Sequence, residues 1–257
     1  PASGKPAVSS SLCGASLFAM LLAASPAALA NNFIDLSGIE DLNGRSLNPT
    51  GIAADGNVIV GNSPNAHGRS RAYRWNALTG KLDDLGALAG GDSASARAVN
   101  ANGEVVVGAA TDGNASSRAF RWTAADGMQS LGTLNGGSFS EANAVNAKGD
   151  VVVGSSGISS VARHAFRWTE AAGMQDLGTL QGGANSTAFG VNAVGDVVVG
   201  EADNGRTDVN GNRIYRAFRW SEAKDKMEDL GTLAGDNSKA TAVNATGNVV
   251  VGSSNYK

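Results

Sequence analysis

The side chains that most often carry catalysis are sparse in this chain of 257 residues, which has two histidines and one cysteine. His67 and His164 occupy different places in the sequence, and no carboxylate stands at a ligand spacing from either. The chain has no His-Glu-x-x-His metal motif, no Gly-x-Ser-x-Gly turn and no phosphate-binding loop. No nucleophile has an adjacent base in the sequence pattern. We therefore expect a protein that is not an enzyme and that has no catalytic or cofactor-binding residues.

One segment carries oxygen-bearing side chains at alternate positions, as calcium loops do. Residues 201–215 are fifteen residues in a place where the equivalent segments have nine. The loop pattern needs a glycine and a glutamate where this chain has Arg213 and Arg219. We expect a plain extended hairpin, and the alternative is a weak calcium site. Its oxygen ligands would come from Asp203, Asp208, Asn210 and Asn212.

A tryptophan-ended pentapeptide recurs four times and shows how these segments are organised. Its tryptophans are 47, 46 and 52 residues apart, a period typical of repeat architectures. The copies are Arg71-Ala-Tyr-Arg-Trp75, Arg118-Ala-Phe-Arg-Trp122, His164-Ala-Phe-Arg-Trp168 and Arg216-Ala-Phe-Arg-Trp220.

Each period contains short apolar segments bounded by glycine, asparagine, aspartate or serine, which is the signature of strands. Four strands in 40–50 residues form one β-propeller blade, whereas a β-helix would show shorter sub-repeats. The sequence therefore predicts an all-β propeller. In the third period the predicted strands are Ala144-Val-Asn146, Val151-Val-Val-Gly154, Ala165-Phe-Arg-Trp168 and Leu177-Gly-Thr-Leu180.

The pattern also predicts how the strands are joined and packed. Asn146 to Gly149 reads as a tight turn, with glycine at positive φ and asparagine bonding its own backbone. An uninterrupted valine run indicates a strand that is buried on both faces. In Ala-Phe-Arg-Trp the two aromatic side chains share one face, and alanine and arginine share the other. The repeated arginines are expected to pair with Asp84, Asp176 or Asp229.

In these elements the chain resembles the HAF family of extracellular repeat proteins, over about residues 33–252. The family's His-Ala-Phe stands at residues 164–166, and the Ala-Val-Asn and Asp-Leu-Gly-Thr-Leu-x-Gly-Gly elements match as well. The other copies have arginine in place of histidine, and the first has Tyr73 in place of phenylalanine. The resemblance implies a passenger region of a secreted or autotransporter protein of bacteria, and it implies no catalytic residue.

The repeats predict four complete blades and a partial fifth in a domain spanning residues 31–257. Residues 33–39 align with residues 174–180, so we expect a lone fourth strand there. The chain stops in the middle of a unit at Lys257. We therefore expect a truncated sequence, with further repeats and a membrane-inserted β-barrel downstream.

The first thirty residues read as a secretory signal peptide, because a short apolar run precedes the small-residue pattern Ala28-Leu-Ala30. Cys13 lies upstream of that run, so it is not read as a lipid anchor. The net charge of −3 favours neither nucleic acid nor an anionic membrane as partner, and no membrane span is expected in this chain.

Together these features predict an exported, non-catalytic module outside the bacterial cell or in its periplasm, which binds a protein or a glycan at the cell surface. Its role would be adhesion or protein interaction. The alternative is a glycan-binding or glycan-active propeller with a site in the central channel. Acids and aromatic residues at the channel mouth would favour that alternative, and small residues there would favour the scaffold.

Overall fold

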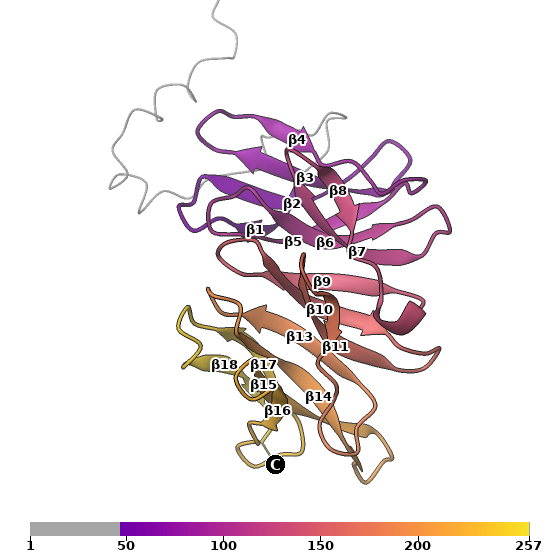
Figure 1. Ribbon diagram of the computed structural model, residues 1–257, viewed down its shortest axis with the longest axis vertical. Coiled ribbons are helices and arrows are strands. Elements are labelled where there is room, and N and C mark those ends of the chain that lie inside the picture. The colour runs from indigo at the N-terminus through magenta and orange to yellow at the C-terminus, as the bar shows by residue number, and fades with distance from the viewer. Residues whose placement is uncertain (1–46, 257) are drawn as a thin grey trace, which may run out of the picture. The chain divides into compact units, whose positions relative to one another are not determined.

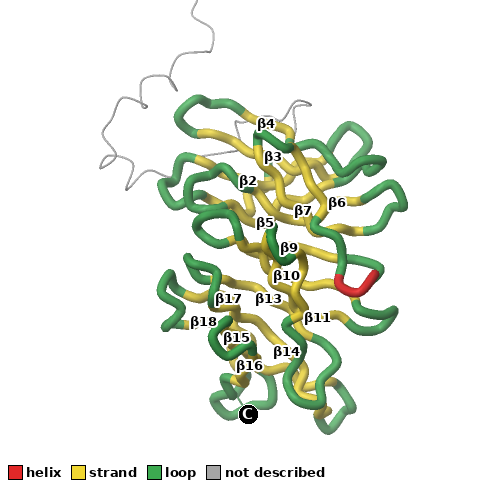
Figure 2. Tube along the Cα trace, viewed as in Figure 1, coloured by secondary structure: helices red, strands yellow, loops and turns green. Residues whose placement is uncertain are grey.

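Extended strands alternate with tight turns throughout residues 47–256, which are the residues that the computed structural model describes (Figure 1). In Figure 2 almost all regular structure is strand, and residues 47–256 have one helical turn, the short 3-10 segment Leu134–Gly136. No helix in the described part of the chain is long and apolar enough to cross a membrane. The predicted signal peptide, Cys13 and the lone strand at residues 33–39 lie outside the described residues.

The strands form four antiparallel sheets of four strands and one of two, and each sheet follows chain order. The first two blades are β1 (Asn48–Ile52), β2 (Val58–Pro64), β3 (Ser70–Asn76), β4 (Leu82–Asp84), and then β5 (Ala94–Val99), β6 (Val106–Thr111), β7 (Ser117–Thr123), β8 (Gly127–Ser130). The others are β9 (Ser140–Val145), β10 (Val151–Gly157), β11 (Arg163–Thr169), β12 (Gly173–Asp176), then β13 (Ser186–Val191), β14 (Val197–Thr207), β15 (Arg213–Ser221), β16 (Lys226–Asp229), and last β17 (Ser238–Val243), β18 (Val250–Ser254).

The first strands of successive blades contact one another in the order β1, β5, β9, β13, β17, so they form the inner side of the array (Figure 1). Sheets in sequence order that meet along their first strands are the blades of a β-propeller. The prediction of an all-β propeller with four complete blades and a partial fifth is therefore confirmed. The fifth sheet, β17–β18, is called the half-blade below.

Two strand predictions are corrected by the structure. The first strand of the third blade is Ser140–Val145, and Asn146 belongs to the turn that follows. The fourth strand is Gly173–Asp176 and ends before the Leu-Gly-Thr-Leu segment. It ends there because Asp176 Oδ1 accepts the N–H of Gly178 at 2.8 Å and Gly178 has a φ of +70°.

The apolar core lies between the blades. Each blade packs one of its faces against the next blade. The first blade of such a pair contributes the first and third valines of its valine run and the two leucines that follow its fourth strand. The next blade contributes the middle valine of its run, its phenylalanine and its tryptophan. Val151, Val152 and Val153 are all 4% exposed or less, so both faces of the second strand are buried as predicted. Phe166 packs with residues of the preceding blade, whereas Ala165 packs with the following blade. The predicted division of Ala-Phe-Arg-Trp into two faces is confirmed.

The arginine before each tryptophan links its blade to the next. Arg121 donates to the carbonyl of Gly149 at 3.0 Å, and Arg167 donates to the carbonyl of Gly195 at 2.9 Å. Arg74 and Arg219 make the same bond, to Gly103 at 2.7 Å and Gly247 at 3.4 Å. The expected contacts with Asp84 and Asp176 are made by the first pentapeptide residue: Arg71 pairs with Asp84 at 3.0 Å, and His164 Nδ1 lies 2.9 Å from Asp176. The arginine before the tryptophan pairs with a different carboxylate in two blades, Arg74 with Asp83 and Arg167 with Glu222, both at 3.5 Å.

Tyr73 leads to a stability prediction. It occupies the place of Phe120 and Phe166, its side chain is buried, and its hydroxyl has no hydrogen-bond partner among residues 47–256. Burial raises the pKa of this phenol to about 12. An unsatisfied buried hydroxyl costs about 1–3 kcal/mol, so we expect Tyr73→Phe to stabilise the protein by about 1 kcal/mol. Urea unfolding measures this, with Tyr215→Phe as the half-buried control. A loss of stability in Tyr73→Phe would show that the hydroxyl is bonded in solution.

Candidate functional site

Neither described histidine lies in a catalytic arrangement within residues 47–256. His164 Nδ1 lies 2.9 Å from the carboxylate of Asp176, and the backbone N–H of His67 donates to Asn65 in a hairpin turn. Burial opposes ionisation of Asp176, but bonds from His164 and the N–H of Gly178 outweigh it and lower the pKa of Asp176. No group of three His, Cys, Asp or Glu side chains that could hold a metal ion occurs within residues 47–256.

The inner strands carry a different side chain at the same position in successive blades. Each inner strand from β5 onward has a bulge, and the bulge residues are Arg97, Asn143, Phe189 and Thr241. Arg97 bonds to Glu141 Oε2 at 2.8 Å and also to Asn143 of the next blade. The ammonium of Lys239 lies 3.7 Å from the centroid of the Phe189 ring. These five side chains, Arg97, Glu141, Asn143, Phe189 and Lys239, are called the inner row below.

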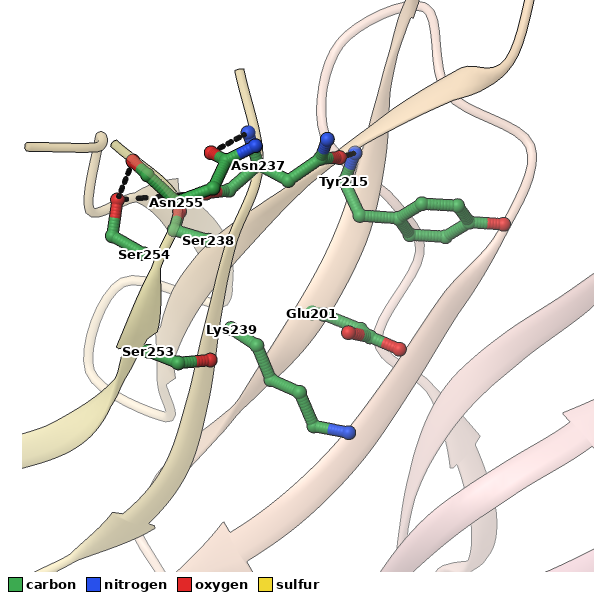
Figure 3. A pocket seen from close by; sticks show the side chains of 8 residues that line it. All are labelled: Glu201, Tyr215, Asn237, Ser238, Lys239, Ser253, Ser254 and Asn255. Atoms are coloured by element: carbon green, nitrogen blue, oxygen red, sulfur yellow. Dashed lines mark hydrogen bonds between the residues drawn. The ribbon is translucent and has the colours of Figure 1, made fainter. Parts of the chain in front are cut away.

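A shallow pocket of about 470 Å³ lies beside the last member of this row, between the fourth blade and the half-blade (Figure 3). Lys239 and Glu201 extend into the same space, and the ring of Tyr215 points away from it. Two asparagine side chains join the strands at the edge of the pocket. Asn237 Oδ1 accepts the backbone N–H of Tyr215 at 2.8 Å, and Asn255 Oδ1 accepts the backbone N–H of Asn237 at 2.8 Å. The pocket therefore offers one cation and one anion to a ligand.

The inserted segment is an extension of the β14–β15 hairpin, as the plain hairpin prediction stated. Asp208 Oδ1 accepts the N–H groups of Asn210 at 2.8 Å and Asn212 at 2.9 Å. Asp112 makes the same turn in the second blade with Asn114 and Ser116. The role of Asp208 is therefore to hold its turn, as Asp112 does in the second blade.

Asp203, the first of the four calcium ligands proposed from sequence, is fully buried at the base of this hairpin. Its carboxylate accepts the N–H groups of Ala184 at 3.0 Å and Gly205 at 2.9 Å, and it pairs with Arg213 at 2.9 Å. The structure thus gives Asp203 and Asp208 separate sets of hydrogen-bond donors. Calcium binding here remains a prediction from the sequence, and an ion would have to displace these donors.

Calcium is therefore expected to leave the thermal midpoint of the protein unchanged at several millimolar, the range of weak extracellular calcium sites. Thermal unfolding with and without calcium measures this in the wild type and in Asp208→Ala. A rise of the midpoint in the wild type that is absent in Asp208→Ala would establish the calcium site instead.

The buried Asp203 carboxylate also gives a pH prediction. Burial opposes its ionisation, but the bonds from Ala184 and Gly205 and the charge of Arg213 outweigh burial and lower its pKa. Its stabilisation is present above the ordinary carboxyl pKa near 3.9 and is lost as pH falls through the lower folded value. Asp203→Asn should cost about 1–3 kcal/mol at pH 7. Urea unfolding at pH 7 and pH 3 should show a smaller difference at the acid pH. If the wild type and Asp203→Asn differed in unfolding free energy by the same amount at pH 7 and pH 3, the lowered pKa of Asp203 would be contradicted.

An apolar surface is exposed on the half-blade and on the blade before it. Leu233 is 83% exposed, although its equivalent Leu180 is only 7% exposed. Val251 is 56% exposed, whereas its equivalent Val153 is fully buried. Leu230 and Val249 are exposed as well, at 45% and 52%. All four residues lie in or beside the last two sheets that the structure describes.

Sequence reasoning did not find the inner row. Bulges put Arg97, Asn143 and Phe189 on the inner side, and a bulge leaves no clear mark in single-sequence alternation. Glu141 and Lys239 belong to the row because their side chains contact those of Arg97 and Phe189.

No protein-family model matches the chain, and no curated protein matches it. Among solved structures, TolB from Acinetobacter baumannii superposes on 76% of this chain with a TM-score of 0.51 and 13% identity. The putative TolB from Agrobacterium tumefaciens superposes on 75% with a TM-score of 0.52 and 11% identity. A prolyl endopeptidase superposes on 80% with a TM-score of 0.50 and 12% identity. The matches span 46%, 67% and 33% of those chains, so they establish the fold and leave activity and partners open.

Proposed function

We propose that this chain is a non-catalytic module that is exported to the bacterial cell surface or periplasm and acts there as a protein-interaction or adhesion scaffold. A place among HAF-type repeats, as the passenger of an autotransporter, belongs to the same proposal. The observation that carries it is the array of four-stranded blades, an architecture similar to that of the two TolB structures.

The way polar residues are used supports a scaffold. The repeated arginines donate to the turn glycines of the next blade, and the repeated asparagines hold their own turns. Polar groups that recur in every blade therefore serve the fold.

Chemical cross-linking in the bacterium that produces the protein tests the proposal. The exported wild type should form cross-links to a partner protein at the cell surface. The absence of any cross-link to a protein at the cell surface, or a chain that stays in the cytoplasm, would contradict the proposal.

A glycan-binding function at the inner side of the propeller is the second candidate, and the inner row favours it. An aromatic ring, a carboxylate and an amide on neighbouring blades are the groups that sugar sites use, and Phe189, Glu141 and Asn143 supply one of each. Calorimetric titration with oligosaccharides should then detect binding to the wild type and none to Phe189→Ala. Binding that is equal in both variants, or undetectable in both, would exclude this site.

A further inference from the structure

The loops that join the second and third strands of the first, second and fourth blades have the same turn. In the second blade, between β6 and β7 (Figure 1), Asp112 Oδ1 accepts the N–H of Asn114 at 2.9 Å and that of Ser116 at 3.0 Å. Asn65 in the first blade and Asp208 in the fourth accept the N–H groups of the residues two and four positions further on in the same way. The three loops therefore correspond residue by residue.

These loops differ in the side chains at their tips. His67, Asn114 and Asn210 are equivalent and exposed. Two residues after each of them stand Arg69, Ser116 and Asn212, respectively. An asparagine followed by any residue except proline and then by serine or threonine is the acceptor pattern of N-linked glycosylation. Of the three loops, only the one in the second blade has this pattern, as Asn114-Ala-Ser116.

Two other asparagines within residues 47–256 have the same pattern, but their side chains hold the fold. Asn185 Oδ1 accepts the N–H of Arg163 at 3.2 Å, and Asn244 Oδ1 accepts the N–H of Val249 at 3.0 Å. The side chain of Asn114 is exposed and makes no hydrogen bond to any residue of the described range. Its amide is therefore accessible to an enzyme without the loss of a contact on which the blades depend.

Ala115 weakens the closed turn of this loop. Its φ is +58°, and the equivalent residues of the first and fourth blades are Gly68 at +74° and Gly211 at +81°. An alanine in the left-handed region is disfavoured because its Cβ comes too close to the backbone, whereas a glycine has no Cβ. The second-blade turn therefore opens more readily than its two counterparts.

An open loop presents both groups of the acceptor pattern to one enzyme. In an extended segment the side chains of residues i and i+2 point to the same side, so the amide of Asn114 and the hydroxyl of Ser116 lie together. Exposed loops with few buried contacts open at little free-energy cost. The loop thus combines an unused amide, a hydroxyl two residues further on and a turn that is easily opened.

We propose that Asn114 is the acceptor of an N-linked glycan, which an oligosaccharyltransferase of the cell envelope transfers from a polyprenyl-diphosphate-linked oligosaccharide. The amide nitrogen forms a bond to C1 of the first sugar, and the bond between that C1 and the diphosphate oxygen breaks. The amide loses one proton, and polyprenyl diphosphate is the leaving group. This inference rests on the proposed export, which brings the chain to the compartment of the transferase, and it adds a covalent modification to the proposed module.

Transfer to the purified, folded chain tests the acceptor. The full chain is incubated with a purified bacterial oligosaccharyltransferase and a polyprenyl-diphosphate-linked oligosaccharide, and intact-mass spectrometry follows the product. The wild type should gain the mass of one glycan, and peptide mapping should place it on Asn114. Ser116→Ala should lose the product completely, whereas Asn244→Gln should keep it. Ala115→Gly should slow the transfer by about fivefold, because a glycine stabilises the closed turn.

The fourth blade supplies a gain-of-function control. Asn210 has the same place in its loop as Asn114, and Asp208 stands two residues before it as Asp112 stands before Asn114. The loop lacks only the hydroxyl, since Asn212 occupies the place of Ser116. Asn212→Thr should therefore add a second glycan to the chain.

Three results would overturn the proposal: no transfer to the folded wild type, transfer to Asn185 or Asn244 in place of Asn114, or transfer that persists in Ser116→Ala. Mass spectrometry of the chain isolated from the bacterium that produces it separates this inference from the proposed function. An exported chain without a glycan on Asn114 would overturn the modification and leave the scaffold function standing. A chain that accepts the glycan in the purified reaction but stays in the cytoplasm would overturn the export and leave the acceptor assignment standing.

Discussion

Phe166→Ala is expected to lower the free energy of unfolding by about 3–5 kcal/mol, the range for removing a buried phenylalanine ring. Phe166 is fully buried between the second and third blades, where it packs against Leu131 and Leu134. The substitution leaves a cavity between two sheets, and the hydrogen bonds within each sheet keep its strands from moving to fill that cavity. Urea unfolding of the purified chain measures the loss.

Trp168→Ala is the matched comparison, because Trp168 lies two residues further along the same face but is only half-buried. Trp220 is 1% exposed and Trp75 is 7% exposed, whereas Trp122 and Trp168 are half-buried. Trp168→Ala should therefore cost clearly less than Phe166→Ala. A loss under about 1 kcal/mol in Phe166→Ala would contradict the packing between blades.

Asn146→Ala should produce the second large effect. Asn146 is 1% exposed, and its Oδ1 accepts three N–H groups, from Gly149 at 3.0 Å, Asp150 at 3.1 Å and Val151 at 3.0 Å. Truncation leaves buried donors without an acceptor, each at about 1–3 kcal/mol when water cannot reach it. We expect a loss of about 3 kcal/mol in total, because part of the turn relaxes towards solvent.

The half-blade supplies a control with the same chemistry. Asn244 accepts the N–H groups of Asn248 at 3.1 Å and Val249 at 3.0 Å, but it is exposed. Water can replace the lost acceptor there, so Asn244→Ala should cost less than about 1 kcal/mol. Equal losses in the two variants, measured by thermal or urea unfolding, would show that the turn bonds matter regardless of burial.

Much of the fold could be predicted from the sequence because the same four-strand unit occurs four times in it. The valine run, the two faces of Ala-Phe-Arg-Trp and the glycine that closes the turn at Gly149 each follow from local stereochemistry, and the structure has all three. Strand ends were predicted less well. Leu177 to Leu180 has the composition of a strand, but the bond from Asp176 to Gly178 ends the strand and turns the leucines into the space between blades.

The candidate sites could not be predicted from the sequence, because they arise from contacts between blades and from bulges, which the residue pattern of one strand does not show. Arg167 bonds the carbonyl of Gly195 across 28 residues of sequence, and only the packing of neighbouring blades brings the two together. Exposure at Leu233 follows from the absence of a neighbouring strand, although its own segment matches that of the buried Leu180. The inner row depends on bulges, which place Arg97 and Phe189 where strict alternation would not.

Hydrogen exchange of the full chain is the most direct measurement of whether the four-stranded blades exist in solution. The amides of β6, β10 and β14 should exchange slowly, because these strands are paired on both sides. The amides of β8, β12 and β16 should exchange faster at alternate positions, because each is the last strand of its sheet. Fast exchange throughout β6, β10 and β14 would contradict the four-stranded blades.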